Sequence, residues 1–261
     1  MTRSPWTISV ATYNLLADAY IKPVHYPLVA PEDFLPENRL PKLDARVATL
    51  GTDVICGQEV DYETYVRIEA RLRPLGYLGR WAHRPRGKKD GCATFVREPW
   101  RIRMAVIRDF ADRPPKPTNR IALLMVLICG PARVVVANTH LEWHPEDAEE
   151  DAKHGLFQAE ELLGGMDGQD ARIICGDFNA APDSATLERF RRAGFIDPHP
   201  PSLATYNAAG KPVKLDYTLH SSDLIATPSP TTLVVPATAL PSPVEPSDHV
   251  PLIASFSPKA R

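Results

Sequence analysis

The chain has 261 residues, of which 44% are hydrophobic and 24% are charged, and its formal net charge is −2. These values are typical of a globular protein with a sizeable core, and we expect a single domain over residues 1–261. The near-neutral charge excludes a global basic field that would hold long duplex nucleic acid. No apolar run approaches the roughly 20 residues that a membrane helix requires.

The N-terminal segment and the cysteines indicate the cellular compartment. Met1–Trp6 lacks the charged-then-apolar layout of a signal peptide, which predicts a cytoplasmic protein. Cys56, Cys92, Cys129 and Cys175 lie in or beside apolar segments and form no C-x-x-C pair. We interpret them as buried reduced thiols, in preference to a disulfide framework or a zinc site.

Short apolar runs alternate with helical patterns along the chain. The runs predict strands over Thr7–Asn14, Asp53–Cys56, Cys92–Arg97, Ile102–Arg108, Ile121–Cys129, Arg133–Thr139, Ala171–Cys175, Lys214–His220, Thr232–Val235 and Val250–Phe256. Apolar residues at helical spacing predict helices over Leu40–Leu50, Tyr62–Leu72, Glu149–Leu163 and Ser184–Ala193, the last with Asp183-Ser184 as its N-cap. Several strands follow one another without an intervening helix, which favours mixed or antiparallel sheets over a purely parallel doubly wound sheet.

Polar side chains recur at the ends of the predicted strands. Five segments run from an apolar strand directly into carboxylate, amide or imidazole groups: TYNLLAD (12–18), VICGQEVD (54–61), VVVANTHLEW (134–143), RIICGDFNAAPDS (172–184) and KLDYTLHS (214–221). A sixth segment, PSDHVPL (246–252), places Ser-Asp-His just before a strand. A sheet holds such groups rigidly while leaving them accessible to a ligand, which suits catalysis.

Each of these residues has a structural explanation when it is taken alone. Asp177 or Asp248 could be a turn residue or a helix cap, Asn14 or Asn179 could form an Asx-turn, and Glu59 could be a solvated loop acid. Six such segments in one chain favour a shared function.

The chemistry of these groups indicates a metal-dependent reaction on phosphate. Oxygen and amide ligands without thiolate pairs suit a hard cation, Mg²⁺ with Mn²⁺ as a substitute, and not zinc. Phosphoester hydrolysis needs a positioned water, neutralised phosphate oxygens and help for the departing oxygen. The sequence therefore predicts a Mg²⁺-dependent phosphoester hydrolase. The basic clusters Arg80–Lys89 and Arg97–Arg108 are either solvated faces or contacts for a short phosphate-bearing substrate.

The motifs GDFNAAPDS, LDYTLHS and SDHVPL, in that order, resemble the endonuclease/exonuclease/phosphatase superfamily, and the resemblance runs from Thr12 to Phe256. TYNLLADAYIKPVHYP, the triplet Gln58-Glu59-Val60, KKDGCATFVR and NTHLEWHPED are similar to the branch with the carbon-catabolite-repressor-type deadenylases, nocturnin, Angel and the 2′-phosphodiesterase. The resemblance implies a four-layer α/β sandwich. Two mixed β-sheets would pack face to face between helices, with the site at one edge.

The resemblance also implies roles for individual residues. Glu59 would be the principal Mg²⁺ ligand with Asn14 beside it, and Asp248 would serve a second metal position or fix its loop. Asp177 would orient or deprotonate the attacking water, and Asn179 would hold the phosphate or a metal-bound water.

The histidines and the substrate contacts follow from the same resemblance. His249 would contact the scissile phosphate with Asp216 orienting it, and His140 would also touch phosphate. Further positions that look substrate-facing, with solvated or packed surface roles as the alternative, are Arg39, Arg86, Asn119 and His144, the last beside Trp143 in a base-binding wall.

Three functional readings remain open at this level. The first is a 3′→5′ exonuclease that acts on single-stranded RNA or DNA ends and releases nucleoside 5′-monophosphates. The second is a phosphatase or phosphodiesterase acting on a small nucleotide: a dinucleotide, a 2′-phosphate or a 2′,3′-cyclic phosphate. The third is a non-catalytic binding module. We expect neither a membrane partner nor a scaffold partner, because the chain has no amphipathic membrane segment and no leucine-rich repeat region.

Overall fold

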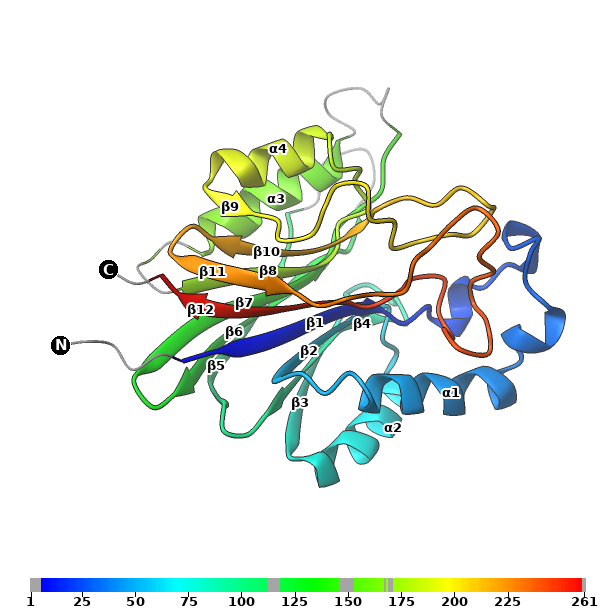
Figure 1. Ribbon diagram of the computed structural model, residues 1–261, viewed down its shortest axis with the longest axis horizontal. Coiled ribbons are helices and arrows are strands. Elements are labelled where there is room, and N and C mark those ends of the chain that lie inside the picture. The colour runs from blue at the N-terminus through cyan, green and yellow to red at the C-terminus, as the bar shows by residue number, and fades with distance from the viewer. Residues whose placement is uncertain (1–5, 112–117, 146–152, 167, 169–170, 260–261) are drawn as a thin grey trace.

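The computed structural model describes residues 6–111, 118–145, 153–166, 168 and 171–259. These residues form two six-stranded sheets that pack face to face (Figure 1). The first sheet has the strand order β11 (Leu224–Pro228), β12 (Leu252–Pro258), β1 (Ile8–Asn14), β2 (Val54–Gln58), β4 (Gly91–Arg97), β3 (Tyr77–His83). The second has the order β5 (Arg101–Asp109), β6 (Ile121–Cys129), β7 (Ala132–His140), β8 (Ala171–Asp177), β10 (Asp216–Ser221), β9 (Phe195–Ile196).

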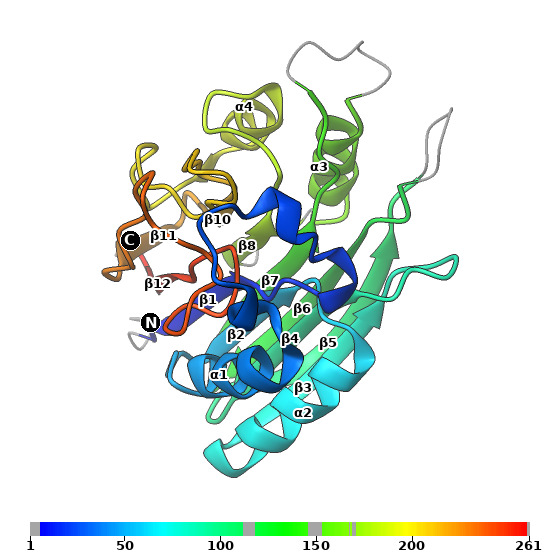
Figure 2. The same cartoon turned by 90° about the vertical axis from the view of Figure 1, so that its right-hand side faces the viewer.

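Helices cover the outer face of each sheet (Figure 2). The first sheet carries α1 (Pro36–Ala48) and α2 (Tyr62–Leu72), and the second carries α3 (His154–Gly164) and α4 (Ala185–Arg192). Short 3₁₀ helices lie at Asp18–Tyr20, Pro23–His25, Pro31–Phe34 and Arg73–Leu75. The arrangement confirms the predicted four-layer α/β sandwich with mixed sheets.

The central strands read as continuous apolar runs because both of their faces are buried. Along β6, Ile121 and Leu123 point into the core between the sheets, whereas Ala122 and Leu124 pack under α3. Burial on both faces removes the alternation of apolar and polar residues that a half-exposed strand shows. The same layering places Cys56, Cys92 and Cys175 in the interior as free thiols, with Cys129 half-buried.

Strand direction brings the polar segments to one end of the sandwich. β1 is parallel to β2, and β7 is parallel to β8, so their carboxyl ends lie together. β12 is antiparallel to β1, and β10 is antiparallel to β8, so the starts of these two strands lie at the same end. In Figure 1 this is the right-hand end of the strands, under the long loops.

The structure corrects several predicted elements. Thr232–Val235 is not a strand but a loop, because Pro230 and Pro236 flank it and Val234 packs in a small loop cluster instead. The sequence patterns missed β3, β9 and β11. All three lie at sheet edges, and β9 has only two residues. Of the predicted helix Glu149–Leu163, residues 149–152 lie outside the described residues, and α3 forms the remainder. Ser184 caps α4 as predicted, accepting a hydrogen bond from the Leu187 amide.

None of the helices within the described ranges is both long and apolar enough to cross a membrane.

Candidate active site

A cavity of about 1090 Å³ opens where the ends of the strands meet. Its walls include six of the residues that sequence reasoning selected: Glu59, His140, Asp177, Asn179, Asp248 and His249. His144 lines it as well. The fold therefore gathers these side chains from four separate segments of the chain around one space.

Asn14 does not line the cavity itself but connects the two sheets through two residues that do, Glu59 and Asp177. Its amide nitrogen donates to Oε1 of Glu59 at 3.2 Å and to Oδ2 of Asp177 at 2.9 Å. Its amide oxygen accepts from the backbone amide of Leu16 at 3.0 Å. Asn14 thus holds two carboxylates from different sheets side by side, and it would have to turn its amide over to offer oxygen to a metal ion.

A second group forms a chain of charges across the cavity. Nδ1 of His249 lies 2.7 Å from Oδ2 of Asp216, and Nε2 lies 3.7 Å from Oδ2 of Asp177. Burial opposes the charge on His249, but Asp216 and Asp177 outweigh it and raise its pKa to about 10. His249 is therefore an imidazolium at neutral pH, held between two carboxylates.

Asp177 sits at the junction of these two groups. Burial raises its pKa to about 6, while the positive charge of His249 opposes the increase. The backbone amide of Asn179 donates to its Oδ1 at 2.9 Å. At neutral pH Asp177 is an ionised carboxylate with a weakly basic character, the state a proton acceptor requires.

His140 contacts the amide of Asn179 in this arrangement. Nε2 of His140 lies 2.9 Å from Nδ2 of Asn179, which also donates to the Leu141 carbonyl at 3.0 Å. Burial, together with the charges of Arg120 and Arg84, holds the pKa of His140 well below its ordinary value. A neutral His140 accepts from Asn179 and thereby fixes the orientation of that amide.

Backbone strain is concentrated around the cavity. Among the described non-glycine residues, φ lies between 49° and 57°, a region that such residues seldom adopt, at Leu16, Glu59, Arg86, Asn119 and Asn179. Glu59 and Asn179 line the cavity, and Leu16 and Asn119 are each within two residues of Asn14 or Arg120. Gly176, immediately before Asp177, lies so close to the Thr139 carbonyl that a Cβ atom would stand 1.9 Å from its oxygen. This glycine lets β7 and β8 approach each other where they deliver His140 and Asp177.

The carboxylates on the Glu59 side fit a divalent cation. Burial, followed by the charge of Asp248, raises the pKa of Glu59 to about 7. Oε2 of Glu59 accepts from the Ala17 amide at 3.1 Å, and Tyr26 donates to Oδ2 of Asp248 at 2.9 Å. Carboxylate oxygens of this kind, with no thiolate beside them, match a hard cation such as Mg²⁺ or Mn²⁺.

A different trio also has metal-ligand spacing. One ligand atom each from Asp177, Asp216 and His249 lies within 4.8 Å of the others. His249 already uses Nδ1 on Asp216, and its positive charge neutralises this trio from within. We therefore favour Glu59 and Asp248 over the trio as the carboxylates that would hold a cation.

Arg39 does not lie where the sequence predicted. It was expected to face the substrate, but its side chain is buried and does not line the cavity. Its guanidinium donates to the carbonyl oxygens of Leu15, Leu16 and Pro246 and pairs with Asp18. Arg39 thus clamps the loop after β1 to the loop that carries Asp248 and His249.

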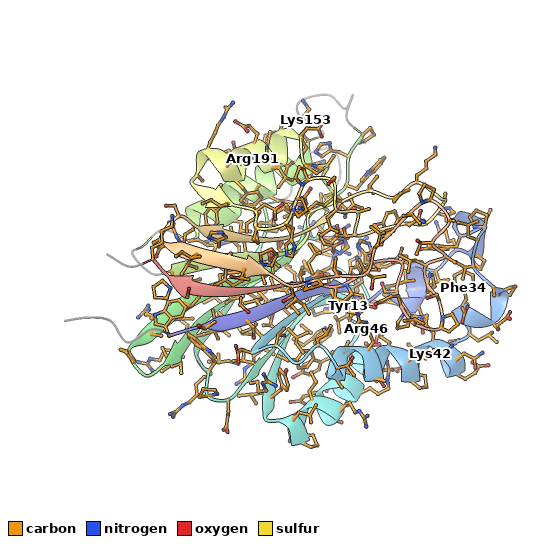
Figure 3. All side chains as sticks on the ribbon, in the orientation of Figure 1. Tyr13, Phe34, Lys42, Arg46, Lys153 and Arg191 are labelled. Atoms are coloured by element: carbon orange, nitrogen blue, oxygen red, sulfur yellow. The ribbon has the colours of Figure 1, made fainter. Side chains whose placement is uncertain are left out.

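A second ion pair supports the same loop. Arg46 of α1 pairs with the buried Glu245 at 2.6 Å, and the hydroxyl of Tyr13 lies 3.4 Å from the other oxygen of Glu245. Tyr13 and Arg46 lie close together at the β1–α1 boundary (Figure 3). The loop before β12 is therefore tied to α1 at two neighbouring points.

The other expected substrate contacts divide between the cavity and its surroundings. Asn119 is buried, and its carbonyl accepts from Nε of Arg84 at 3.0 Å. Arg86 is exposed on the loop between β3 and β4 and does not line the cavity. His144 lies on the wall beside Trp143, whose side chain is 59% exposed.

Sequence reasoning missed a polar network behind the site. Nε2 of Gln58 donates to Oδ1 of Asn138 at 2.8 Å, and Nδ2 of Asn138 donates to the carbonyls of Gly57 and Ala93. Because both amides are buried and satisfied, they fix the register of one sheet against the other. The available signal was an amide at the end of an otherwise apolar strand.

Comparison with known proteins identifies the family of the chain. The sequence profile of the Endonuclease/Exonuclease/phosphatase family matches residues 11–249. The chain belongs to this family. Members of the Endonuclease/Exonuclease/phosphatase family are phosphoester hydrolases, and they typically depend on a divalent metal.

Individual relatives lie in the branch that the motifs indicated. The chain is 27% identical over 299 aligned residues to nocturnin of Xenopus laevis, covering 98% of this chain and 74% of nocturnin. It is 26% identical over 222 residues to the CCR4-Not complex 3′-5′-exoribonuclease subunit Ccr4 of Candida albicans, covering 70% of this chain. The match spans only 28% of Ccr4 and 36% of the protein angel homolog 2 of Danio rerio.

Solved structures share the fold at low identity. The crystal structure of ANGEL2, described as a 2′,3′-cyclic phosphatase, superposes with a TM-score of 0.78 at 19% identity, covering 100% of this chain and 98% of that one. The human nocturnin catalytic domain superposes with a TM-score of 0.73 at 23% identity, over 97% of this chain and 95% of that one.

Proposed function

We propose that the chain is a Mg²⁺-dependent phosphodiesterase that acts as a 3′→5′ exonuclease on single-stranded RNA or DNA ends. The observation that carries the proposal is that Asn14 donates hydrogen bonds to both Glu59 and Asp177. It thereby holds a carboxylate that would bind a cation, Glu59, beside one that would accept a proton, Asp177. The exoribonuclease Ccr4 and nocturnin among the relatives support the same reaction class.

The chain's own residues supply the remaining chemistry. Asp177 would take a proton from the attacking water, whose oxygen forms the new bond to phosphorus while the bond to the 3′-oxygen of the preceding nucleotide breaks. The imidazolium of His249 would contact the scissile phosphate and stabilise its increasing negative charge. The two amide hydrogens of Asn179 are taken by His140 and the Leu141 carbonyl, so Asn179 would accept a hydrogen bond from the attacking water through its amide oxygen. Mg²⁺, held by Glu59 with Asp248, would add Lewis-acid stabilisation of the phosphate oxygens.

A second candidate is hydrolysis of a 2′,3′-cyclic phosphate on a small nucleotide or at an RNA end. The ANGEL2 structure favours it, because that protein is a 2′,3′-cyclic phosphatase solved with adenosine-2′,3′-vanadate and its fold covers this whole chain. Both candidates require the same water, cation and imidazolium. They differ in whether the oligomer becomes shorter.

A single panel separates these candidates. Purified chain with Mg²⁺ is incubated with 5′-labelled single-stranded RNA and DNA, with the same RNA ending in a 2′,3′-cyclic phosphate, and with mononucleotide 2′,3′-cyclic phosphates. Stepwise shortening with release of 5′-monophosphates identifies the exonuclease. Ring opening without shortening identifies the second candidate. No turnover of any of these substrates, with the fold intact, would overturn the proposal.

A further inference from the structure

Two arginines line the cavity, and each pairs with one carboxylate. Arg84 follows β3 and pairs with Asp90, whereas Arg120 precedes β6 and pairs with Glu142. The two side chains have similar charge and burial. They differ in how much of their hydrogen-bonding capacity the protein uses.

Arg84 is fully engaged by its surroundings. Nε donates to the Asn119 carbonyl and Nη2 to the Thr118 carbonyl, both at 3.0 Å. Nη1 lies 3.1 Å from each carboxylate oxygen of Asp90. Because all three nitrogens have partners, Arg84 fixes the Thr118–Asn119 backbone and has little capacity left for a ligand.

Arg120 has spare capacity. Its Nε donates to Oε2 of Glu142 at 2.6 Å, whereas its Nη1 is buried and has no partner within the described part of the chain. Its side chain is only 11% exposed, so bulk water satisfies little of the guanidinium. A buried donor without a partner destabilises the unliganded protein, and a bound acceptor would recover that loss.

Arg120 is a further positive group available at this cavity. In the proposed mechanism the imidazolium of His249 and a cation at Glu59 already compensate the scissile phosphate, whereas Arg120, which lines the cavity with Trp143, is left for a further phosphate. Lys153 lines the same cavity and lies beside α3 (Figure 3). A planar guanidinium presents parallel N–H groups that match the oxygens of a phosphate.

We propose that Arg120 forms a second phosphate-binding subsite, which takes a phosphate group of the substrate other than the one being hydrolysed. The inference rests on the proposed function for its substrate class, a nucleotide or oligonucleotide with a further phosphate next to the scissile one. Glu142 competes with this ligand, because it holds an anionic charge against the same guanidinium. Removal of the Arg120 charge and removal of the Glu142 charge should therefore have opposite effects on phosphate binding.

The test measures binding without turnover. Inorganic phosphate and pyrophosphate are titrated into the chain in EDTA by isothermal calorimetry, with unfolding temperature as the check on the fold. Arg120→Gln should weaken binding about tenfold or more, since it removes a charge-assisted hydrogen bond. Glu142→Gln should strengthen binding several-fold, because the competing anion is lost. Arg73→Gln, at a side chain that is 70% exposed in the 3₁₀ helix after α2, controls for the loss of one positive charge.

The outcomes decide between a subsite and a structural ion pair. If Arg120→Gln and Glu142→Gln weaken binding alike, or change it no more than Arg73→Gln does, the subsite is refuted. If Arg120→Gln does not fold, Glu142→Gln and Arg120→Lys still test the inference: the first should strengthen binding, and the second should weaken it because the planar fork is lost. Phosphate binding that follows this pattern in a chain without turnover would refute the proposed function and leave the subsite standing.

Discussion

The two halves of the site handle buried negative charge differently. On the β8–β10 side, Asp177 and Asp216 enclose the imidazolium of His249, so the chain supplies its own cation. On the β1–β2 side, Glu59 faces Asp248 and receives only amide donors, and burial raises its pKa to about 7. The two groups of carboxylates differ because His249 forms ion pairs with Asp177 and Asp216, whereas its charge only partly opposes the raised pKa of Glu59. In the proposed mechanism the first half would serve proton transfer and charge stabilisation, and the second would hold an external cation.

The largest effect is expected from Asp177→Asn. It removes the proton acceptor while preserving shape, so turnover should fall by about 10²–10⁴. The Mg²⁺ concentration for half-maximal turnover should change little, because Glu59 remains. Since burial makes the Asp177 charge costly, the unfolding temperature should stay level or rise. Initial rates over a Mg²⁺ series, with thermal melts in parallel, check all three. Undiminished turnover would show that Asp177 is not the proton acceptor.

Arg39→Met tests the clamp that joins the two halves. It leaves the carbonyls of Leu15, Leu16 and Pro246 and the carboxylate of Asp18 without their shared cation. We expect a loss of about 3–5 kcal/mol in the free energy of unfolding, measured by urea denaturation. Arg73→Met, at an exposed helical position, is the matched control and should change the stability by less than about 0.5 kcal/mol. Equal stability of the two variants would show that Arg39 is not a structural clamp.

Glu59→Gln tests the opposite half. The amide keeps the shape but loses the anionic ligand, so the Mg²⁺ concentration for half-maximal turnover should rise about tenfold or more. At saturating Mg²⁺ much of the turnover should return, in contrast to Asp177→Asn. A Mg²⁺ titration that coincides with that of the unsubstituted chain would place the cation elsewhere.

The smallest effect concerns pH. Without divalent cations, the pKa of Glu59 is raised from 4.5 to about 7, and that of Asp177 from 3.8 to about 6. The folded chain then holds more protons than the unfolded chain between these values, so stability in EDTA should fall as the pH rises through them. His249, with its pKa raised to about 10, has the same sign above pH 6.5.

Mg²⁺ should reverse this loss by compensating the ionised carboxylates. The increase in unfolding temperature on adding Mg²⁺ should therefore be larger at pH 8 than at pH 5.5, by about a few degrees. Differential scanning fluorimetry in matched buffers measures it. In Glu59→Gln the difference between the two pH values should shrink, and an unchanged difference would contradict the assignment of the cation to Glu59.

The fold could be predicted from the sequence where burial is strongest. The central strands and the helices α1, α2 and α4 follow from apolar runs and helical spacing, because burial constrains which residue types are tolerated there. Edge strands such as β3 carry Gly79, Arg80 and His83 and escape that constraint. The strand predicted at Thr232–Val235 failed for the converse reason, since apolar residues in a long loop can form a core of their own.

The sequence by itself determined the chemistry available to this protein: carboxylates, amides and imidazoles at the ends of buried strands, and a family signature in their order. Only the tertiary structure decided how these groups divide the work. It placed Arg39 in a clamp instead of the cavity, held His140 neutral against Asn179 and left Arg120 with unused donors. The physical reason is that charge state and hydrogen-bond capacity depend on which residues, distant along the chain, stand within a few ångströms. Local sequence patterns carry no record of those neighbours.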